Sequence, residues 1–262
     1  ATNSLSLSSL CLVVALGLVI GVNFANDYSD GVRGTDDHRV GPQRLVGSGA
    51  AAPGRVRAAA FCCFGVSGLA GLAAVAVTGH WWLLAVGVAC VLAAWFYTGG
   101  RHPYGYLGLG EVFVFIFFGL VATAGTDYLL CGHVSAAGWA AAVAMGLTAD
   151  GVLVTNNLRD IASDTAAGKR TLETRLGDRA SRLLYAGLVV AVAVCCVLVA
   201  ALSTWWALLG LLGAALLVPA ARTILGGAVG LRLVSTLRST SMGELVLSLG
   251  LLAGVAVARL TA

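Results

Sequence analysis

The sequence is poor in charged residues. Only 11% of its 262 residues are Asp, Glu, Lys or Arg, whereas 59% are hydrophobic. An ordinary soluble domain carries about 25% charged residues, so this chain lacks the polar surface that such a domain needs. No low-complexity segment and no separate soluble domain interrupts it. These absences favour a protein whose surface is covered by lipid.

The sequence also lacks the marks of several other classes. A transmembrane β-barrel alternates apolar and polar residues in segments of about ten, and this chain shows no such alternation. Its seven cysteines have no paired CxxC spacing, which argues against a metal site or a disulfide framework. The first apolar stretch has no basic leader and no small-residue cleavage site, so we do not interpret it as a signal peptide.

Long apolar stretches dominate what is present. Runs of about 18 or more apolar residues predict transmembrane helices. Eight segments are predicted: Leu5–Asn26, Pro53–Thr78, Trp81–Tyr97, Glu111–Ala124, Val134–Thr155, Ala180–Leu202, Trp205–Leu225 and Ser241–Ala258. The 35 glycines fit this interpretation, because small residues let membrane helices approach closely. We expect an all-α polytopic membrane protein with a single domain over residues 1–262.

The charged residues gather on one side of this predicted bundle. Fifteen of the 16 Lys and Arg residues lie in or beside the loops that follow segments one, three, five and seven, and Arg259 is the exception. The positive-inside rule therefore predicts that this side is cytoplasmic. Eleven of the 12 acids lie there too, except Asp127. Because acids contribute little to orientation, their clustering indicates a site at the cytoplasmic membrane edge.

The first polar motif, "NFANDYSDGVRGTDDHRVGPQR", follows the first apolar segment. Its first four Asn and Asp residues are spaced i, i+3, i+4 and i+7, which places them on one helical face. They are Asn23, Asn26, Asp27 and Asp30. Asp36 and Asp37 follow in the loop.

The second polar motif, "NNLRDIASDTAAGKRTL", begins at Asn156. Asn156, Asp160 and Asp164 are spaced i, i+4 and i+8, again on one helical face. Asn157 stands beside them, and Lys169 and Arg170 follow the glycine that ends the run. The sequence thus places Asn-x-x-x-Asp twice at the same membrane edge.

Two rows of carboxylates suggest a cation. Facing carboxylates would repel one another and lose solvation. Mg²⁺ would remove that cost, since it prefers hard oxygen ligands and often binds substrate phosphates at the same time. The nearby Arg and Lys residues offer donors for those phosphates. The alternative is a solvated loop with helix caps and surface ion pairs, but the repeated spacing on one side favours a magnesium–diphosphate site.

The two motifs resemble the paired Asp-rich motifs of the UbiA superfamily of intramembrane prenyltransferases. "NNLRDIASDTAAGKRTL" followed by "RLG", together with "NFANDYSDGVRGTDDHRVGPQRLVGSG" and "YTGGRHPYGYLGLGEVFVFIFFG", is similar to one branch, the 1,4-dihydroxy-2-naphthoate polyprenyltransferases of menaquinone biosynthesis. The resemblance covers nearly the whole chain. Because that family has nine transmembrane helices, it also implies a helix before the eight segments found here.

The resemblance implies a reaction and its partners. A polyprenyl chain would pass from polyprenyl diphosphate to 1,4-dihydroxy-2-naphthoate with Mg²⁺, releasing diphosphate and CO₂ and giving demethylmenaquinone. The enzyme would lie in a bacterial plasma membrane, with its active site on the cytoplasmic side and no nucleic acid partner. The resemblance leaves the oligomeric state open.

Site residues follow from the motifs that match. Catalytic residues are expected to be Asn26, Asp27, Asp30, Asn156, Asp160 and Asp164. The metal ligands are expected to be Asn26, Asp30, Asp36, Asn156, Asp160 and Asp164, and the diphosphate ligands Arg39, Arg44, Lys169 and Arg170. Substrate contacts are expected from Tyr97, Arg101, Tyr104, Tyr106 and Glu111. The tyrosines could shield a cation or simply anchor helices at the interface, and Glu111 could equally be a helix-start carboxylate.

Two other functions fit parts of the pattern. A UbiA-type enzyme could use another aromatic acceptor, such as 4-hydroxybenzoate, although "GKRTL" and "YTGGRHPYGYLGLGE" are naphthoate-like. A cation transporter is a different class, and its acids should lie at mid-depth in the bilayer, often on broken helices. Here the acids crowd one face instead.

Overall fold

The structure is a computed structural model that describes residues 2–35 and 41–261. All regular elements in these two ranges are helices, as predicted. Seven spans are long and apolar enough to cross a membrane, and Leu83–Phe96 is a shorter apolar helix. These eight helical stretches coincide with the eight predicted segments, and their length and composition are those of an integral membrane protein.

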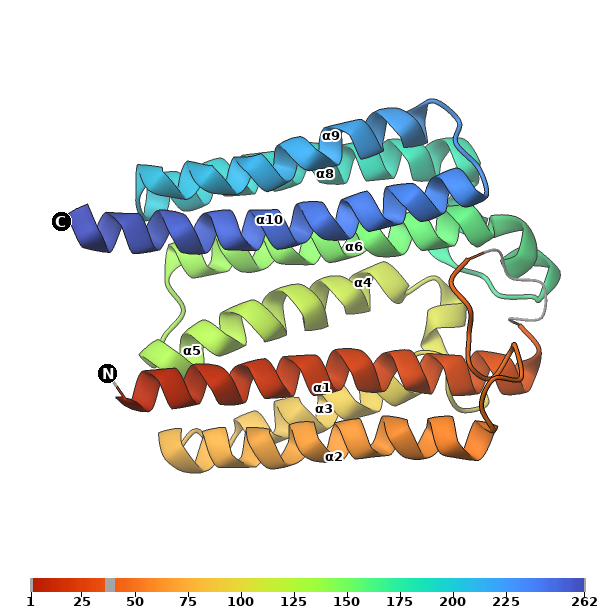
Figure 1. The fold of residues 1–262 in the computed structure, drawn as a ribbon, viewed down its shortest axis with the longest axis horizontal. Coiled ribbons are helices and arrows are strands. Elements are labelled where there is room, and N and C mark those ends of the chain that lie inside the picture. Colours follow the sequence, from red (N-terminus) through yellow and green to blue (C-terminus); the bar gives the residue numbers. More distant parts are fainter. Residues whose placement is uncertain (1, 36–40, 262) are drawn as a thin grey trace. The chain divides into compact units, whose positions relative to one another are not determined.

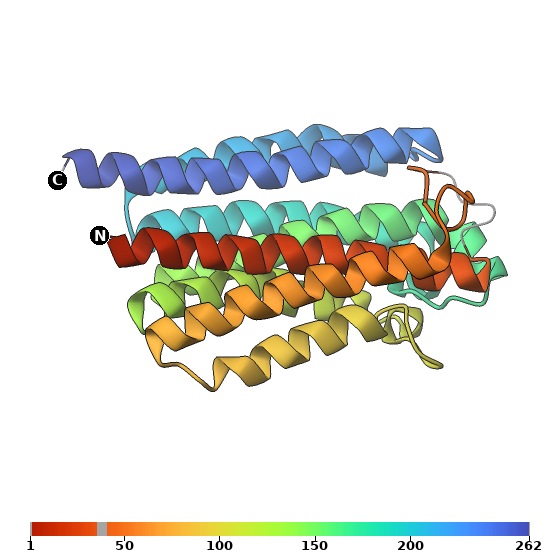
Figure 2. The same cartoon turned by 60° about the horizontal axis from the view of Figure 1, so that its bottom comes forward.

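The chain divides into two compact units. The first comprises residues 1–109 and 128–132, and the second comprises residues 110–127 and 133–262. The first unit contains α1 (Thr2–Arg33), α2 (Pro53–Thr78), α3 (Leu83–Phe96) and the short 3₁₀ helix η1 (Tyr104–Leu107). Its three long helices run side by side, with α1 packed mainly along α2 (Figure 2).

Small residues bring α1 and α2 together. A Cβ atom added to Gly17 would lie 2.2 Å from Oγ of Ser67, and one added to Gly21 would lie 2.5 Å from the ring of Phe64. In a membrane, where lipid is as apolar as the helix surface, such close packing is a main source of helix association. Gly17 and Gly21 therefore set the spacing between the two helices.

Turn chemistry defines the α2–α3 hairpin. Pro53 occupies the start of α2, where its fixed φ suits a helix and its missing N–H is not needed. Gly79 ends the helix in the left-handed region, with φ 75°, and donates its N–H to the carbonyl of Val75 at 2.8 Å. The hairpin returns the chain, so the loops that follow α1 and α3 lie at the same end of the first unit.

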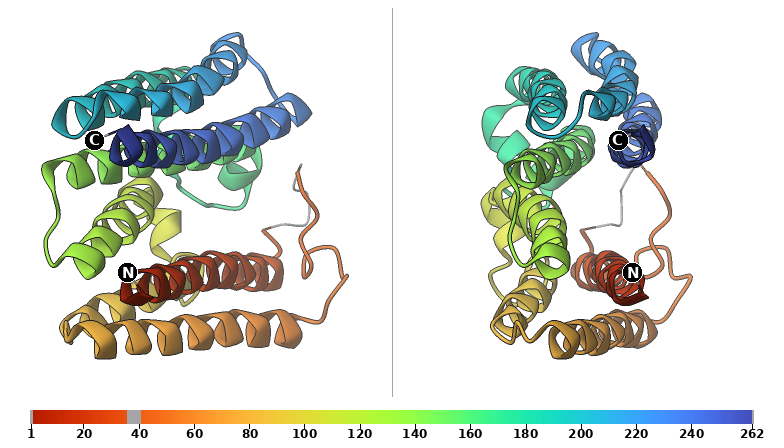
Figure 3. Two further views of the ribbon diagram at one scale, coloured as in Figure 1. Left: turned by 60° about the vertical axis from the view of Figure 1, so that its left-hand side comes forward. Right: turned by 90° about the vertical axis from the view of Figure 1, so that its left-hand side faces the viewer.

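The second unit holds the remaining helices. They are α4 (Gly110–Val114), the π-helix η2 (Phe115–Ala124), α5 (Gly125–Cys131), α6 (Ala136–Ala166), α7 (Leu172–Leu176), α8 (Asp178–Leu202), the 3₁₀ helix η3 (Trp205–Gly210), α9 (Leu211–Leu225) and α10 (Leu231–Thr261). Helix α6 packs beside α8, and α10 packs beside both α6 and α9 (Figures 1 and 3). Residues 128–132, which include the end of α5, group with the first unit.

A glycine contact joins the π-helix to α6. A Cβ atom on Gly119 would lie 2.5 Å from the Cα atom of Gly146, so only glycine permits this approach. The π-helix belongs to one continuous span, Gly110–Cys131, that carries Glu111 in its first turn. This span is longer than the predicted Glu111–Ala124, because the helix continues through less apolar residues.

A packed core lies along the part of α6 that carries the second motif. Val154 and Leu158 of α6 pack with Tyr185 of α8, Ile224 of α9 and Leu233 of α10, all nearly inaccessible to solvent. The second motif starts within this stretch of α6. Its polar side chains therefore stand on a helix that three neighbours hold in place.

Candidate active site

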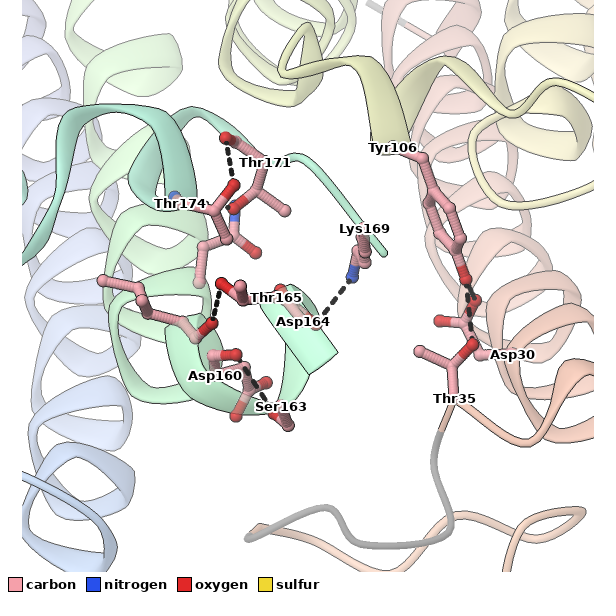
Figure 4. A network of polar contacts seen from close by, with 12 residues as sticks. Asp30, Thr35, Tyr106, Asp160, Ser163, Asp164, Thr165, Lys169, Thr171 and Thr174 are labelled. Carbon is pink, nitrogen blue, oxygen red and sulfur yellow. Dashed lines mark hydrogen bonds and ion pairs between the residues drawn. The ribbon is translucent and has the colours of Figure 1, made fainter. Parts of the chain in front are cut away.

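The first polar cluster lies at the end of α1 in the first unit and consists of Asn26, Asp27 and Asp30 with Thr98 and Tyr106. Helix α1 continues beyond the apolar segment to Arg33, so the three α1 residues are helical. The hydroxyl of Tyr106 donates to Oδ1 of Asp30 at 2.8 Å, as Figure 4 shows. The hydroxyl of Thr98 donates to Oδ1 of Asn26 at 2.9 Å. The loop after α3 thus contacts two of the predicted metal ligands.

Asp27 is engaged by the backbone. Its Oδ2 accepts the N–H of Leu45 at 2.8 Å, and its Oδ1 accepts the N–H of Val46 at 3.0 Å. Charge-assisted bonds of this kind are stronger than neutral ones. The predicted catalytic role of Asp27 stays a prediction, but its contacts are those of a residue that anchors the loop after α1.

Arg33 ties the end of α1 to the loop after α3. Its guanidinium donates to the carbonyl oxygens of Thr98 and Gly100 and lies 5.5 Å from the centre of the Tyr106 ring. In the sequence, this arginine contributed only to the predicted orientation of the chain in the membrane. In the structure it also has a local role, because Arg33 donates to two loop carbonyl groups and lies over the ring of Tyr106, which contacts Asp30.

The predicted substrate-binding tyrosines cluster in the same loop. The rings of Tyr97 and Tyr104 meet edge to face at 5.4 Å, and the Tyr104 hydroxyl donates to the carbonyl of Ala93 at 2.7 Å. Burial, followed by the charge of Asp30, raises the pKa of Tyr106 to about 12. Tyr106 therefore keeps its proton at physiological pH and stays a donor.

The remaining predicted residues of this unit differ in position. Arg101 is exposed, and Arg44 is half-buried at the start of the loop segment that Asp27 holds. Asp36 and Arg39 lie outside the described residues, so the structure says nothing of them.

The second polar cluster lies at the end of α6 in the second unit. It consists of Asn156, Asn157, Asp160 and Asp164 of α6, with Arg159, Lys169, Glu111 and Glu173 around them. The Arg159 guanidinium donates two hydrogen bonds of 2.6 Å each to the Asp160 carboxylate. Lys169 lies 3.7 Å from Asp164 (Figure 4). Predicted metal ligands thus stand beside cationic groups.

A short turn places Lys169. Helix α6 ends at Ala166, and Gly168 follows with φ 73°, a conformation that favours glycine. The next N–H, that of Lys169, donates to the carbonyl of Asp164 at 2.8 Å. This turn folds Lys169 back toward the last carboxylate of the motif, whereas Arg170 is exposed.

Glutamates complete this cluster on its buried side. The side-chain Nδ2 of Asn157 donates to Oε1 of Glu111 at 3.1 Å. Glu173 of α7 is fully buried beside them. Burial, followed by the negative charge of Glu111, raises the pKa of Glu173 to about 8. Glu111, predicted to contact substrate, therefore belongs to the packing beneath the motif.

Sequence reasoning missed two members of these clusters. Thr98 is an ordinary threonine after an apolar segment, and nothing local marks it. Glu173 follows Thr171, whose hydroxyl caps α7 by accepting the N–H of Thr174 at 3.3 Å. An acid in the first turn after such a cap is common, so Glu173 gave no signal of its own.

Comparison with known proteins identifies the family of this arrangement. The UbiA prenyltransferase family matches residues 1–228. The 1,4-dihydroxy-2-naphthoate octaprenyltransferase of Mycobacterium tuberculosis is 49% identical over 252 residues, which are 96% of this chain and 86% of that protein. Its namesake in Mycobacterium leprae is 50% identical over 90% of this chain and 80% of its own length.

A more distant relative matches over a similar length. The Escherichia coli protein with the same name is 37% identical over 94% of this chain and 82% of its own length. The matches include both polar clusters, since each covers nearly the whole chain. From the family match and the two Asp-rich helix ends, we conclude that this chain belongs to the UbiA prenyltransferase family.

Proposed function

We propose that this chain is a Mg²⁺-dependent prenyltransferase that joins a polyprenyl chain to 1,4-dihydroxy-2-naphthoate. The observation that carries the proposal is the identity of about half of all residues with two enzymes of that name, over at least 90% of the chain. Diphosphate and CO₂ are released, and the product is demethylmenaquinone.

The donor set fits Mg²⁺ that is shared with a diphosphate. Among the described residues no group of three or more His, Cys, Asp or Glu side chains could hold a metal. Mg²⁺ commonly binds one or two carboxylates and completes its shell with water and substrate phosphates. Asp30 in the first cluster, and Asp160 and Asp164 in the second, supply that number. When bound, the ion would stabilise negative charge that develops on the departing diphosphate.

The cationic residues have a matching task. Lys169 stands beside Asp164, and Arg170 and Arg101 are exposed in their own loops. Ammonium and guanidinium groups bind phosphate oxygens strongly. We assign Lys169 and Arg170 to the diphosphate, together with Arg44 and Arg39, and Arg101 to a phosphate or to the acceptor carboxylate.

The reaction follows from charge stabilisation. Cleavage of the C–O bond leaves the electron pair on the diphosphate and an allylic cation on the prenyl chain, which the loop tyrosines can face. The electron-rich ring carbon that bears the carboxylate then forms the new C–C bond. Loss of CO₂ returns the electron pair of the broken bond to the ring, so no strong base is required.

The membrane position follows from the charge distribution. Fifteen of 16 Lys and Arg residues belong to loops on one predicted side, which we propose faces the cytoplasm of a bacterial cell. The prenyl donor and acceptor would meet there, at the edge of the bilayer. The family match does not support the alternative of a cation transporter.

Prenyl transfer in membranes tests the proposal. Membranes containing this chain receive octaprenyl diphosphate and carboxyl-labelled 1,4-dihydroxy-2-naphthoate, with Mg²⁺ or with EDTA. We expect Mg²⁺-dependent prenylated product with an equal amount of labelled CO₂, and a loss of at least about 100-fold in Asp30→Ala and in Asp160→Ala. Asp127→Ala is the matched control, since Asp127 accepts the N–H of Ser135 and lies at the other end of the Gly110–Cys131 span from Glu111.

The outcomes separate the possibilities. Transfer to 4-hydroxybenzoate but not to the naphthoate would change the acceptor and keep the reaction class. Product that forms equally in EDTA would overturn the metal dependence. Labelled acceptor carboxylate retained in the product would overturn the decarboxylating step.

A further inference from the structure

Two glutamates meet in the interior of the second unit. Glu173 of α7 is 0% exposed and Glu111 of α4 is 8% exposed, and their carboxyl groups lie within hydrogen-bonding reach of one another. Both oxygens of Glu173 and Oε2 of Glu111 are buried and have no hydrogen-bond partner within the described ranges. Burying a carboxylate oxygen without a donor is costly, so this site lacks a component.

The missing component is either a hydrogen-bond donor or a cation, and the residues around the two glutamates favour a hydrogen-bond donor. Within residues 2–35 and 41–261, the side chain that bonds to the pair is the Asn157 amide, whose N–H₂ group donates to Oε1 of Glu111 at 3.1 Å. An N–H group directed at the pair would repel a metal ion placed there. The described part of the chain also offers no third carboxylate, imidazole or thiol close enough to complete a metal site.

The charges around the pair point the same way. Helix α7 packs against α6 and α8. Asp150 of α6 lies near enough for the charge of Glu111 to act on it, whereas Asp178 and Arg182 at the start of α8 are bonded to each other. Arg159 and Lys169, the two cations of the second cluster, are paired with Asp160 and Asp164, and two adjacent buried carboxylates cannot both stay ionised.

We propose that Glu111 and Glu173 bind one proton between them and that this carboxyl pair holds the Asn157 amide in place. Glu173 carries the proton and donates it to Glu111, while Glu111 also accepts from Asn157. One bound proton thus gives a partner to Oε2 of Glu111 and to one oxygen of Glu173, and it reduces the charge of the pair to one. Since Asn157 sits between Asn156 and the turn that carries Asp160, the pair positions the second Asp-rich motif.

The consequence for catalysis rests on the proposed function, but the proton site does not. Burial and the charge of Glu111 keep Glu173 protonated near neutral pH, with a pKa of about 8. Ionisation of Glu173 at higher pH would set two negative charges against each other and loosen the hold on Asn157. Glu111 and Glu173 are thus positioning residues, since neither has to touch the reacting atoms.

Infrared spectroscopy of the purified full chain, without substrate, tests the proton site. Wild type should show protonated-carboxyl absorption that disappears as the pH rises from about 6 to about 10. Glu173→Gln should lower the amplitude of this titrating absorption by one carboxyl group, because the amide donates to Glu111 and no proton is needed. Glu111→Gln should lower it too, and serves if the first variant does not fold. Asp127→Asn is the control and should leave it unchanged.

Prenyl transfer then reports the positioning role. Glu173→Ala should lower transfer by about tenfold or more, because it leaves a buried Glu111 oxygen unpartnered, while Glu173→Gln should restore it to nearly the wild-type rate. Titrating absorption that keeps its wild-type amplitude in both glutamine variants would overturn the shared proton. Equal transfer by Glu173→Ala and wild type would overturn the positioning role, even if the acceptor proves to be a different aromatic compound.

Discussion

Tyr106 donates its hydroxyl hydrogen to Asp30 across 2.8 Å, from a loop that follows α3 to a carboxylate on α1. Thr35 lies 3.2 Å from the same hydroxyl (Figure 4). The bond engages Oδ1 and holds the Asp30 carboxylate in one orientation. Such a donor behind a metal-binding carboxylate usually tunes the affinity for the metal.

Tyr106→Phe tests this arrangement. The ring remains, but Asp30 loses its donor and becomes free to rotate. We expect the Mg²⁺ concentration that gives half-maximal prenyl transfer to rise by about tenfold, since loss of such a supporting bond costs about 10–100-fold in metal affinity or activity. The measurement is a Mg²⁺ titration of the transfer rate in membranes.

Tyr185→Phe is the matched control for this experiment. Its hydroxyl is buried in the second unit and lies 2.7 Å from Oγ1 of Thr240, which is not a carboxylate. It should cost stability of about 1 kcal/mol but leave the Mg²⁺ requirement unchanged. An equal rise of the half-maximal Mg²⁺ concentration in both variants would show that the hydroxyl of Tyr106 does not tune the metal affinity.

Asp27→Ala should loosen the loop that follows α1. The carboxylate accepts the N–H groups of Leu45 and Val46, and both would lose their partner. Hydrogen exchange at these two amides should speed up by about tenfold or more, because a charge-assisted bond contributes about 1.5–3 kcal/mol. Mass spectrometry of peptides over residues 44–50 measures this change.

Asn23→Ala supplies the comparison on the same helix. Asn23 is exposed, and its side chain donates to the carbonyl of Val19, one turn earlier. Its removal should not alter exchange at Leu45 or Val46. If Asp27→Ala also leaves exchange unchanged but abolishes transfer, Asp27 acts on the substrate or metal rather than on the loop.

The helices were predictable because residues close to each helix end determine where the helix begins and ends. Pro53 and Gly79 bracket α2, so the predicted segment Pro53–Thr78 matches the helix. The apolar pattern ends at Asn26, whereas α1 continues to Arg33. The helix continues through the polar residues after Asn26, which have helical spacing. The same spacing correctly predicted that Asn26 and Asp30 share a helical face.

The partners of these residues were not predictable, because they come from distant parts of the chain. Thr98 binds Asn26 and Glu173 lies against Glu111, and no local pattern records either pairing. Arginines show the same limit. Arg33 and Arg182 carry the positive-inside signal, yet their guanidinium groups also satisfy carbonyl oxygens at loop and helix ends.

Arg182→Ala should destabilise the protein without changing the metal requirement. The nearly buried guanidinium holds Asp178 with two bonds of 2.6 Å and donates to the carbonyl of Ile224 at the end of α9. Its loss should cost about 2 kcal/mol, because the Ile224 carbonyl is left without this donor. Thermal unfolding in detergent measures this cost.

Arg179→Ala is the control for that experiment. Arg179 is exposed on the same helix turn, so it carries the same topological charge without the buried contacts. It should leave the unfolding temperature nearly unchanged. A similar loss in both variants would mean that the charge at this membrane edge, and not the bonds of Arg182, sets the stability.

The stability of the protein should fall as the pH rises toward about 8, and Glu173 should be a cause. Its pKa is raised from an ordinary 4.5 to about 8 by burial and by Glu111. Between these values the folded chain holds a proton that the unfolded chain has released, so the stabilisation is complete below about 4.5 and is lost progressively up to about 8. The loss amounts to about 1.4 kcal/mol per pH unit at most.

Thermal unfolding in detergent between about pH 6 and about pH 9 measures this dependence. Glu173→Gln has no proton to lose at this position, so its unfolding temperature should fall less steeply with pH than that of wild type. The slopes of the two curves should differ most below about pH 8. Asp127→Asn makes the same chemical change outside the pair and should keep the wild-type slope. Parallel curves for wild type and Glu173→Gln would show that the folded chain holds no proton at Glu173. A proton that the folded chain binds and the unfolded chain releases must contribute to the slope, and Glu173→Gln removes that contribution.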